Sequence, residues 1–589
     1  MKMVSRVVRR FPVALAVPLV LVAPLALTAG CGSDAPPAPA ASATARPSGP
    51  APSAGSASPS PSPTGDPAER AAAAVRRMTD ADLAGQVLMP YAYGNDATRV
   101  DAASIAGNRQ IGGVDTPAQM ITKFRLGGLI LVGFSAQDPT GSTNPTTNVE
   151  NPEQVRTLTA GLQQAAAGLP SGAPLLIGTD QEYGVVTRVT DGVTMLPSAM
   201  GFGAAGAPRL TETAWHAAGA ELAAMGINLD FAPVADTLGA QGSAVLGSRA
   251  YGADAKANAE QVAAAVRGLQ SAGVSAALKH FPGHGHTTAD SHAELPVVEQ
   301  SMKAWKNQDR PPFTAGIAAG ADVVMSGHLD VKALDPGVAA TFSHKVMTDV
   351  LRGQMKFTGV AVTDAMNMAP AKKWSPGEAA VRALNAGNDL LLMPPDLIAA
   401  RDGIVAGLAD KSLPRSRLEE AVTRILTLKF RRAGAEQPEL STVNSAEHQQ
   451  AARAAAAAAI TVLRGSCTGP QLGGVAVTVT AARGREVARV ALVKALQAAG
   501  VEVHASGGKI VHLVGYGDRT TDLRSDADVT VMMDTPYLLS AARSPVLIAT
   551  YSSSPASMAA LADLLAGRAD APGRSPVAVS GLPRSVCRT

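Results

Sequence analysis

At 589 residues the chain is too long for one ordinary domain, so we expect two folded domains with appendages. Hydrophobic residues make up 46% of the sequence, which supplies enough apolar material for large cores. The formal net charge is only +3, and the Lys and Arg residues are dispersed along the chain. These features exclude a nucleic-acid-binding protein that depends on a basic surface.

The first 30 residues are typical of an export signal. Four basic residues lie within the first ten positions, and an apolar run follows over residues 11–27. The run is short and is followed closely by small residues, which argues against a permanent membrane-spanning helix. The segment Leu-Thr-Ala-Gly-Cys that ends at Cys31 resembles the lipobox of bacterial lipoproteins, although Leu27 lies one position early. We expect a lipoprotein signal peptide over residues 1–30 and lipidation at Cys31; the alternative is an ordinary signal peptide with a chance Cys nearby.

Residues 31–67 are almost wholly Ala, Pro, Ser, Gly and Thr. Such a segment cannot bury a core, so we expect a disordered and partly extended tether. Behind a lipid anchor, the tether would let a catalytic domain reach away from the membrane. The sequence therefore predicts an exported protein at the extracytoplasmic face of the cell membrane. We expect a fraction of the molecules to be secreted.

Apolar, strand-like runs alternate with Ala-rich helical stretches over residues 68–435. This alternation predicts a parallel sheet, and seven or eight such units favour a (β/α)8 barrel of the TIM type over an open sheet. A glycine-rich phosphate loop does not follow the first strand, which argues against a dinucleotide-binding fold. The predicted strands cover residues 128–132, 174–178, 228–233, 274–279, 323–326, 359–362 and 390–393.

A polar connector over residues 436–470 leads to a second, smaller α/β domain over residues 471–589. We expect a doubly wound sheet with helices on both faces, an αβα sandwich. Its predicted strands cover residues 475–480, 501–504, 510–514, 529–533, 546–551 and 577–580. Cys467 and Cys587 flank this domain, and an exported protein reaches a compartment that permits disulfides, so the two either pair or remain free thiols.

Polar residues recur at the C-terminal ends of the predicted barrel strands. A barrel brings these ends together around one pocket, so we expect the functional site there. The residues are Asp180 with Glu182, Asp236, the loop that begins at His280, His328 and Asp364.

Within residues 279–292, a carboxylate at Asp290 precedes an imidazole at His292 by two positions. In an extended loop, residues two apart point the same way, so the pair can hydrogen-bond. Asp290 would then fix the tautomer of His292, which can give a proton to a leaving group. Asp364 ends a predicted strand and is placed for nucleophilic attack. Each feature alone also fits a structural role, such as an ion pair or a helix cap.

His284 and His286 raise the alternative of a zinc site, with Asp290 and His292 nearby. A third cluster of ligands at a familiar spacing does not stand out. We therefore predict no metal and no other cofactor.

The loop over residues 279–296 resembles the signature of the β-N-acetylglucosaminidases (β-hexosaminidases) of glycoside hydrolase family 3, in their two-domain bacterial lipoprotein form. Further segments match in the family's order over residues 68–432, and the second domain resembles the C-terminal α/β domain of such members. The matching segments are Met78-Thr79 with Gly85-Gln86, Phe124 to Gly128, Thr179-Asp180-Gln181-Glu182 with Arg188, Asn228 to Asp236, Gly247-Ser248-Arg249, Thr363-Asp364 and Asn385 to Asp389.

The resemblance implies the role of each site residue. Asp364 matches the nucleophile that forms a covalent glycosyl-enzyme intermediate, His292 the general acid/base and Asp290 its orienting partner. The residues implied in binding N-acetylglucosamine are Asp180, Arg188, Arg249, Lys279 and His280. The chain departs from the family's pattern at Tyr183-Gly184-Val185 in place of Gly-Gly-Arg, at His286 in place of Asp, and at Ala365 in place of an acidic residue.

The resemblance predicts an exo-acting, retaining β-N-acetylhexosaminidase that acts on carbohydrate: peptidoglycan fragments (muropeptides) or chitooligosaccharides. Retention is expected because Asp364 would attack covalently and His292 would change from acid to base. An N-acetylglucosaminide phosphorylase or a β-glucosidase of the same family remains an alternative. A non-catalytic sugar-binding lipoprotein and a zinc-dependent hydrolase built on His284, His286 and His292 are the others.

Overall fold

A computed structural model describes residues 65–133, 146–240, 242–243, 245–467, 472 and 475–587. The predicted signal peptide, Cys31 and residues 31–64 of the predicted tether lie outside the described residues. Within the described ranges, no helix combines the length and the apolar character needed to cross a membrane.

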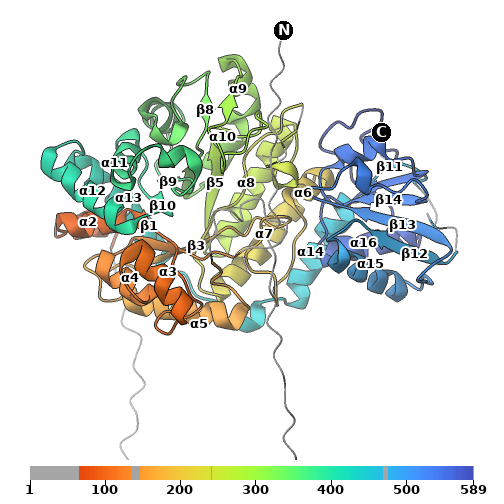
Figure 1. Cartoon of the computed structure of the whole chain (residues 1–589), viewed down its shortest axis with the longest axis horizontal. Helices are drawn as coiled ribbons and strands as arrows, with labels where there is room; N and C mark the ends of the chain where they lie inside the picture. The colour runs from red at the N-terminus through yellow and green to blue at the C-terminus, as the bar shows by residue number, and fades with distance from the viewer. Residues whose placement is uncertain are drawn as a thin grey trace, which may run out of the picture. The chain divides into compact units, whose positions relative to one another are not determined.

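Within the described residues, eight parallel strands curl into a barrel (Figure 1). Six are hydrogen-bonded in the order β2-β3-β4-β5-β7-β9, and β1 pairs with β10. A bridge from Val362 to Leu390 joins β9 to β10. The Ile130 amide donates to the Pro90 carbonyl at 3.0 Å, which joins β2 to the end of β1 and closes the ring. The strands are β1 (Leu88–Met89), β2 (Gly128–Ile130), β3 (Leu176–Thr179), β4 (Leu229–Asp230), β5 (Ser275–Phe281), β7 (Val323–Ser326), β9 (Val360–Thr363) and β10 (Leu391–Leu392).

The barrel prediction is confirmed, and each of the seven predicted strands overlaps an observed one. The remaining strand, β1, was not predicted, because two residues are too few to form a recognisable pattern. All seven residues of β5 are buried. Such continuous burial is expected for a parallel strand that has the barrel core on one side and helices on the other.

Helices follow the strands along the outside of the barrel (Figure 1). Short polar side chains begin several of them; Thr79 forms a capping box with Asp82 at the start of α2, and Asp254 caps α8. The helices are α1 (Pro67–Val75), α2 (Asp80–Gln86), α3 (Ala102–Gly112), α4 (Pro117–Phe124), α5 (Pro152–Ala166), α6 (Ala199–Ala205), α7 (Pro208–Ala224), α8 (Ala255–Ser271), α9 (Met302–Gln308), α10 (Arg310–Ala318), the π-helix η4 (Lys345–Gln354), α11 (Pro376–Ala386), α12 (Leu397–Asp410) and α13 (Arg415–Arg432).

Shorter elements lie in the connections between these strands and helices. Two short strands, β6 (Val297–Val298) and β8 (Asp330–Val331), pair with each other outside the ring. The 3-10 helices of this part of the chain are η2 (Gly247–Arg249), η3 (Ala340–Phe342), η5 (Ala369–Lys373) and η6 (Leu440–Thr442).

The second domain is built on a five-stranded sheet in the order β11-β15-β14-β13-β12. The strand β11 is antiparallel to β15, and the other neighbours are parallel. The predicted strands at 501–504 and 577–580 are reduced to single bridges, at Val503 and Val579. The elements are α14 (Ala446–Ala459), β11 (Thr461–Arg464), β12 (Val477–Ala481), α15 (Glu486–Ala498), β13 (Lys509–Val514), η7 (Thr520–Asp522), β14 (Val529–Met532), η8 (Pro536–Ala541), β15 (Val546–Ala549) and α16 (Pro555–Leu565).

The two faces of this sheet have different neighbours. Successive strand residues point to opposite faces, and accordingly Val531 and Met532 belong to two different apolar clusters. The helices α14, α15 and α16 lie on one side of the sheet, where α16 contacts the other two (Figure 1). The cluster that contains Met532 includes Met200 and Leu246 of the barrel, so barrel side chains cover the other face.

Cys467 and Cys587 form a disulfide, with their Cα atoms 5.1 Å apart. Of the two alternatives that the sequence leaves open, the structure has the paired one. The bridge closes a segment of 120 residues and joins the beginning of the second domain to its end.

Candidate active site

A pocket lies at the C-terminal ends of the barrel strands, with about 550 Å³ of empty space if its open mouth is included. Every predicted binding or catalytic residue except Asp290 lines it, and Asp290 contacts one that does. One wall is apolar and one is charged. The lining residues are Asp180, Glu182 and Arg188 after β3, Val245 and Arg249 after β4, Lys279, His280, His284, Ser291 and His292 in and after β5, Met325 in β7, Asp364, Ala365 and Met368 after β9, and Leu392 and Met393 in and after β10.

Asp364 directly follows β9 and is 9% exposed. Its amide donates to the Ser326 carbonyl at 2.9 Å, and its Oδ1 accepts from the Ala365 amide at 2.8 Å. Burial raises the pKa of this carboxyl, but the imidazoles of His280, His328 and His292 and the Ala365 amide outweigh it, so the pKa lies below its ordinary value. The side chain is therefore ionised, which is the form that attacks an electrophilic carbon.

Asp290 and His292 form a hydrogen-bonded pair, with Nδ1 of His292 2.7 Å from Oδ1 of Asp290. The His292 amide donates to the same oxygen at 2.9 Å, which fixes the backbone as well as the ring. The hydrogen bond with His292 lowers the pKa of Asp290, so this carboxylate remains charged. Because Nδ1 is occupied, Nε2 is the atom of His292 left to exchange a proton in the pocket.

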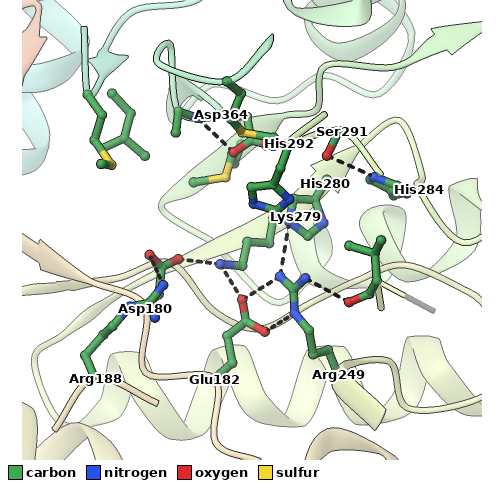
Figure 2. A pocket seen from close by; sticks show the side chains of 16 residues that line it. Asp180, Glu182, Arg188, Arg249, Lys279, His280, His284, Ser291, His292 and Asp364 are labelled. Atoms are coloured by element: carbon green, nitrogen blue, oxygen red, sulfur yellow. Dashed lines mark hydrogen bonds and ion pairs between the residues drawn. The ribbon is translucent and has the colours of Figure 1, made fainter. Parts of the chain in front are cut away.

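A buried ionic network forms the charged wall (Figure 2). Glu182 accepts from Arg249 through Nε at 2.7 Å and through Nη2 at 2.8 Å. The Lys279 Nζ lies 2.6 Å from both Glu182 Oε1 and Asp180 Oδ1. Arg188 lies 3.5 Å from Asp180. Such donors and acceptors, held rigidly by one another, can bind the hydroxyl and amide groups of a polar ligand.

The pKa values of the network favour its charged form. Burial raises the pKa of Glu182, but Arg249 and Lys279 outweigh burial and bring it well below its ordinary value. Burial lowers the pKa of Lys279, but Asp180 and Glu182 reverse this and raise it. Buried charges are costly unless they are paired in this way.

Asp236 fixes the ring of His280 through a hydrogen bond, with Oδ2 of Asp236 2.7 Å from Nδ1 of His280. The other oxygen of Asp236 accepts from the His284 amide at 2.8 Å, so one carboxylate fixes both residues. Burial, and then the neighbouring His280, lower the pKa of His284 to about 4, so this ring is neutral at pH 7. Its Nε2 lies 3.2 Å from the Ser291 hydroxyl, beside the catalytic candidates Asp290 and His292.

The geometry does not support the zinc alternative. His284 pairs with Ser291, His286 with Asp309 at 2.9 Å, and His292 with Asp290. Across the described ranges, no three His, Cys, Asp or Glu side chains come together as metal ligands. The three imidazoles therefore support different parts of one loop and do not converge.

In the sequence, two important residues, Glu182 and Asp236, are recognisable only as polar groups at strand ends. Glu182 joins Arg249 to Lys279, and Asp236 fixes His280 and His284. The partners Arg249 and His280 lie 67 and 44 positions further along the chain, so no local spacing indicates these pairs. Met393, an apolar residue of the pocket lining, also gives no signal in the sequence.

Comparison with known proteins agrees with this geometry. The sequence model described as "Glycosyl hydrolase family 3 N terminal domain" matches residues 108–428. A structure titled as a glycoside hydrolase family 3 beta-N-acetylglucosaminidase from Paenibacillus sp. str. FPU-7 is 31% identical, with a TM-score of 0.73, and the match covers 85% of this chain and 99% of that one.

Two curated relatives carry similar names. Beta-hexosaminidase A of Pseudoalteromonas piscicida is 33% identical over 339 residues, which are 53% of this chain; the chain spans about half (54%) of that relative. Beta-hexosaminidase of Pseudomonas aeruginosa (strain LESB58) is 38% identical over 278 residues, 46% of this chain and 80% of that protein. Since the family model matches more than half of the sequence and the barrel carries the pocket at its expected end, the chain belongs to glycosyl hydrolase family 3.

Proposed function

We propose that the protein is an exo-acting, retaining β-N-acetylhexosaminidase that releases terminal N-acetylglucosamine from peptidoglycan fragments or chitooligosaccharides. One observation carries the proposal: an ionised carboxylate, Asp364, and a hydrogen-bonded Asp290–His292 pair belong to the same pocket as the Glu182–Arg249–Lys279 network. The names of the relatives that are more than 30% identical support the substrate class.

The reaction would use these groups in two steps. Asp364 attacks the anomeric carbon while His292 gives its Nε2 proton to the departing glycosidic oxygen. The result is a glycosyl ester on Asp364. His292, now neutral, accepts a proton from water as the water attacks the ester, and the sugar leaves with its original configuration. Asp290 stabilises the imidazolium and fixes its orientation throughout.

The charged network would bind the terminal sugar unit. Arg249 and Lys279 offer N–H donors to sugar hydroxyls and to an acetamido oxygen, and Asp180 accepts from hydroxyls. The bidentate pair between Glu182 and Arg249 holds the guanidinium in one orientation. An exo mode of action would require that the pocket accept only the end of a glycan.

A second candidate is an N-acetylglucosaminide phosphorylase, in which phosphate takes the place of water. The observation that favours it is the proton donor itself, since an imidazole repels an anionic acceptor less than a second carboxylate would. A β-glucosidase is the weaker alternative, because the proton donor here is the imidazole of His292 and not a carboxylic acid. The ionised Asp364 argues against a non-catalytic sugar-binding protein.

The proposal includes export and a lipid anchor at Cys31, which rest on the basic and apolar N-terminal segment. Expression of the full chain with and without Cys31→Ser, followed by membrane fractionation and labelling with an alkyne fatty acid, tests this part. Label on the Cys31→Ser variant, or a wild-type protein without label, contradicts the anchor.

The decisive experiment follows a 4-nitrophenyl β-N-acetylglucosaminide and its glucoside analogue by NMR, in water and with added phosphate. We expect rapid cleavage of the N-acetylglucosaminide and not of the glucoside, with the β-configured sugar as the first product. A faster reaction with the glucoside contradicts the substrate class. Formation of a sugar 1-phosphate instead identifies the phosphorylase.

A further inference from the structure

The loop between β4 and α8 carries Arg249 into the pocket. Arg249 belongs to the 3-10 helix η2, which has only three residues, Gly247–Arg249. The turn is supported internally by the Gly247 amide, which donates to the Ser243 carbonyl at 2.8 Å, and by the Arg249 amide, which donates to the Leu246 carbonyl at 2.8 Å. So short a helix does not fix the direction of a long side chain by itself, and its neighbours must contribute.

The neighbours of this loop are residues of the second domain, which forms one compact unit with the barrel. Three glycines of the loop lie so close to the second domain that a Cβ atom added to any of them would contact or overlap a residue of that domain. The pairs are Gly242 with the Tyr537 ring (2.9 Å from the added Cβ), Gly247 with both carboxylate oxygens of Asp534 (3.7 Å) and Gly252 with Pro576 (2.7 Å).

Apolar contacts flank the same turn on both sides. Leu246 and Ala250 precede and follow η2, and both are completely buried. They belong to the apolar cluster that includes Met532, Ala549 and Tyr551 of the second domain. The turn that carries Arg249 is therefore packed against the face of the second-domain sheet that the barrel covers.

Asp534 adds a polar contact at the centre of this packing. It follows β14 by two positions and is 5% exposed. Burial raises the pKa of its carboxyl, and the hydroxyl and amide of the adjacent Ser248 oppose that rise. Ser248 directly precedes Arg249, so a carboxylate of the second domain faces the backbone that aims the guanidinium at Glu182.

We propose that the second domain is part of the substrate-binding machinery, with Asp534 as a positioning residue that holds the Gly247–Arg249 turn and so aligns Arg249 with Glu182. The inference rests on the proposed function in one respect, namely that the Arg249–Glu182 pair binds the sugar. Asp534 itself lies outside the residues that line the pocket.

Kinetic analysis of Asp534→Ala and Asp534→Asn in the full-length protein tests the role of the side chain. The matched control is Asp526→Ala, which removes an exposed second-domain carboxylate that pairs with Arg524. We expect Asp534→Ala to lower kcat/KM about 10- to 30-fold, mainly through KM, because misalignment of a binding group weakens sugar binding. Asp534→Asn should recover most of the loss, and the control should remain within about twofold. A normal kcat/KM for Asp534→Ala overturns the proposal.

A double-mutant cycle with Arg249→Ala shows whether Asp534 acts through Arg249. If it does, Asp534→Ala has little further effect once Arg249 is gone, since coupled residues are not additive. An equal loss in both backgrounds means that Asp534 acts by another route, and contradicts the inference.

Hydrogen–deuterium exchange gives a readout that does not require turnover. Amides of residues 245–251 should exchange faster in Asp534→Ala than in wild type, and at the wild-type rate in Asp526→Ala. If wild type fails to cleave the N-acetylglucosaminide, the proposed function fails while exchange still decides this inference; unchanged exchange overturns it. Should Asp534→Ala not fold, Tyr537→Ala removes the contact at Gly242 and is judged by the same measurements.

Discussion

The barrel and the second domain each gather the carboxyl ends of parallel strands at one edge of a sheet, and the two edges satisfy their charges differently. In the second domain, Arg485 forms a bidentate pair with Asp518, which accepts hydrogen bonds from Nε at 3.1 Å and from Nη2 at 3.0 Å. In the barrel, Arg249 is equally well paired with Glu182, but this pair faces a pocket that also holds Asp364 and other ionisable groups. Arg485 also lines a pocket, of about 330 Å³ of empty space, but none of the Asp, Glu or His residues that the structure describes lines that pocket with it. Parallel topology therefore supplies the edge, and a chemical site requires that several ionisable groups share one pocket there.

The largest expected effect concerns the one carboxylate that would form a covalent bond. Asp364→Ala should lower kcat by about 10⁴-fold or more, because the reaction loses its nucleophile. The measurement is release of 4-nitrophenol from the N-acetylglucosaminide, with Asp402→Ala, an exposed carboxylate paired with Arg401, as the control. Retention of a tenth of the wild-type rate would exclude Asp364 as the nucleophile.

The next largest effect is expected on the stability of the second domain. Removing both cysteines, as Cys467→Ala with Cys587→Ala, should destabilise this domain by about 4 to 5 kcal/mol, since the bridge closes 120 residues in the unfolded chain. Urea unfolding measures the change. We expect kcat at 25 °C to remain within about twofold, because both cysteines lie outside the pocket lining. A stability equal to that of wild type contradicts the prediction.

A matched pair of arginines tests the comparison directly. Both Arg249 and Arg485 are buried and bind a carboxylate through two nitrogens. Arg249→Ala should lower kcat/KM about 10³-fold, whereas Arg485→Ala should leave it within about threefold. Both should lower stability, because each removes the guanidinium that pairs with a buried carboxylate. Equal kinetic losses for the two variants would refute the distinction between the edges.

The smallest effect is a pH dependence of stability that arises at His284. Its folded-state pKa is about 4, below the ordinary value of 6.5. Between these values the unfolded chain binds the extra proton, so this group adds stability above pH 6.5 that is lost as the pH falls towards 4, about 3 kcal/mol in total. In His284→Gln, the slope of the unfolding free energy against pH between pH 4.5 and 6.5 should be shallower. The difference in slope should correspond to most of one bound proton. Identical slopes for the two proteins would contradict it.

Local patterns made much of the fold predictable. Strand–helix alternation and its repetition indicate a barrel, and the two-residue spacing of Asp290 and His292 indicates a hydrogen-bonded pair. The strand β1 cannot be predicted from the sequence, because its pattern spans only Leu88 and Met89. The pairing of Glu182 with Arg249 cannot be predicted either, because the two lie 67 positions apart in the chain.

The sequence also does not show what covers the second face of the C-terminal sheet. The apolar runs around Met532 and Leu547 mark both residues as buried, but burial alone does not distinguish a helix of the same domain from the barrel. The apolar cluster with Met200 and Leu246 depends on the tertiary arrangement. For the same reason, Gly247 is unremarkable in the sequence until Asp534 is seen beside it.

The disulfide has a mechanical consequence. A force applied at the C-terminal side of Cys587 passes through the bridge to Cys467 and then into β11, so the covalent path of the force bypasses β12, β13, β14 and β15. In a single-molecule pulling experiment the bridged domain would hide 120 residues, or roughly 400 Å of extended chain at about 3.3 to 3.6 Å per residue. That length would appear in the force–extension trace only after a reducing agent opens the bridge.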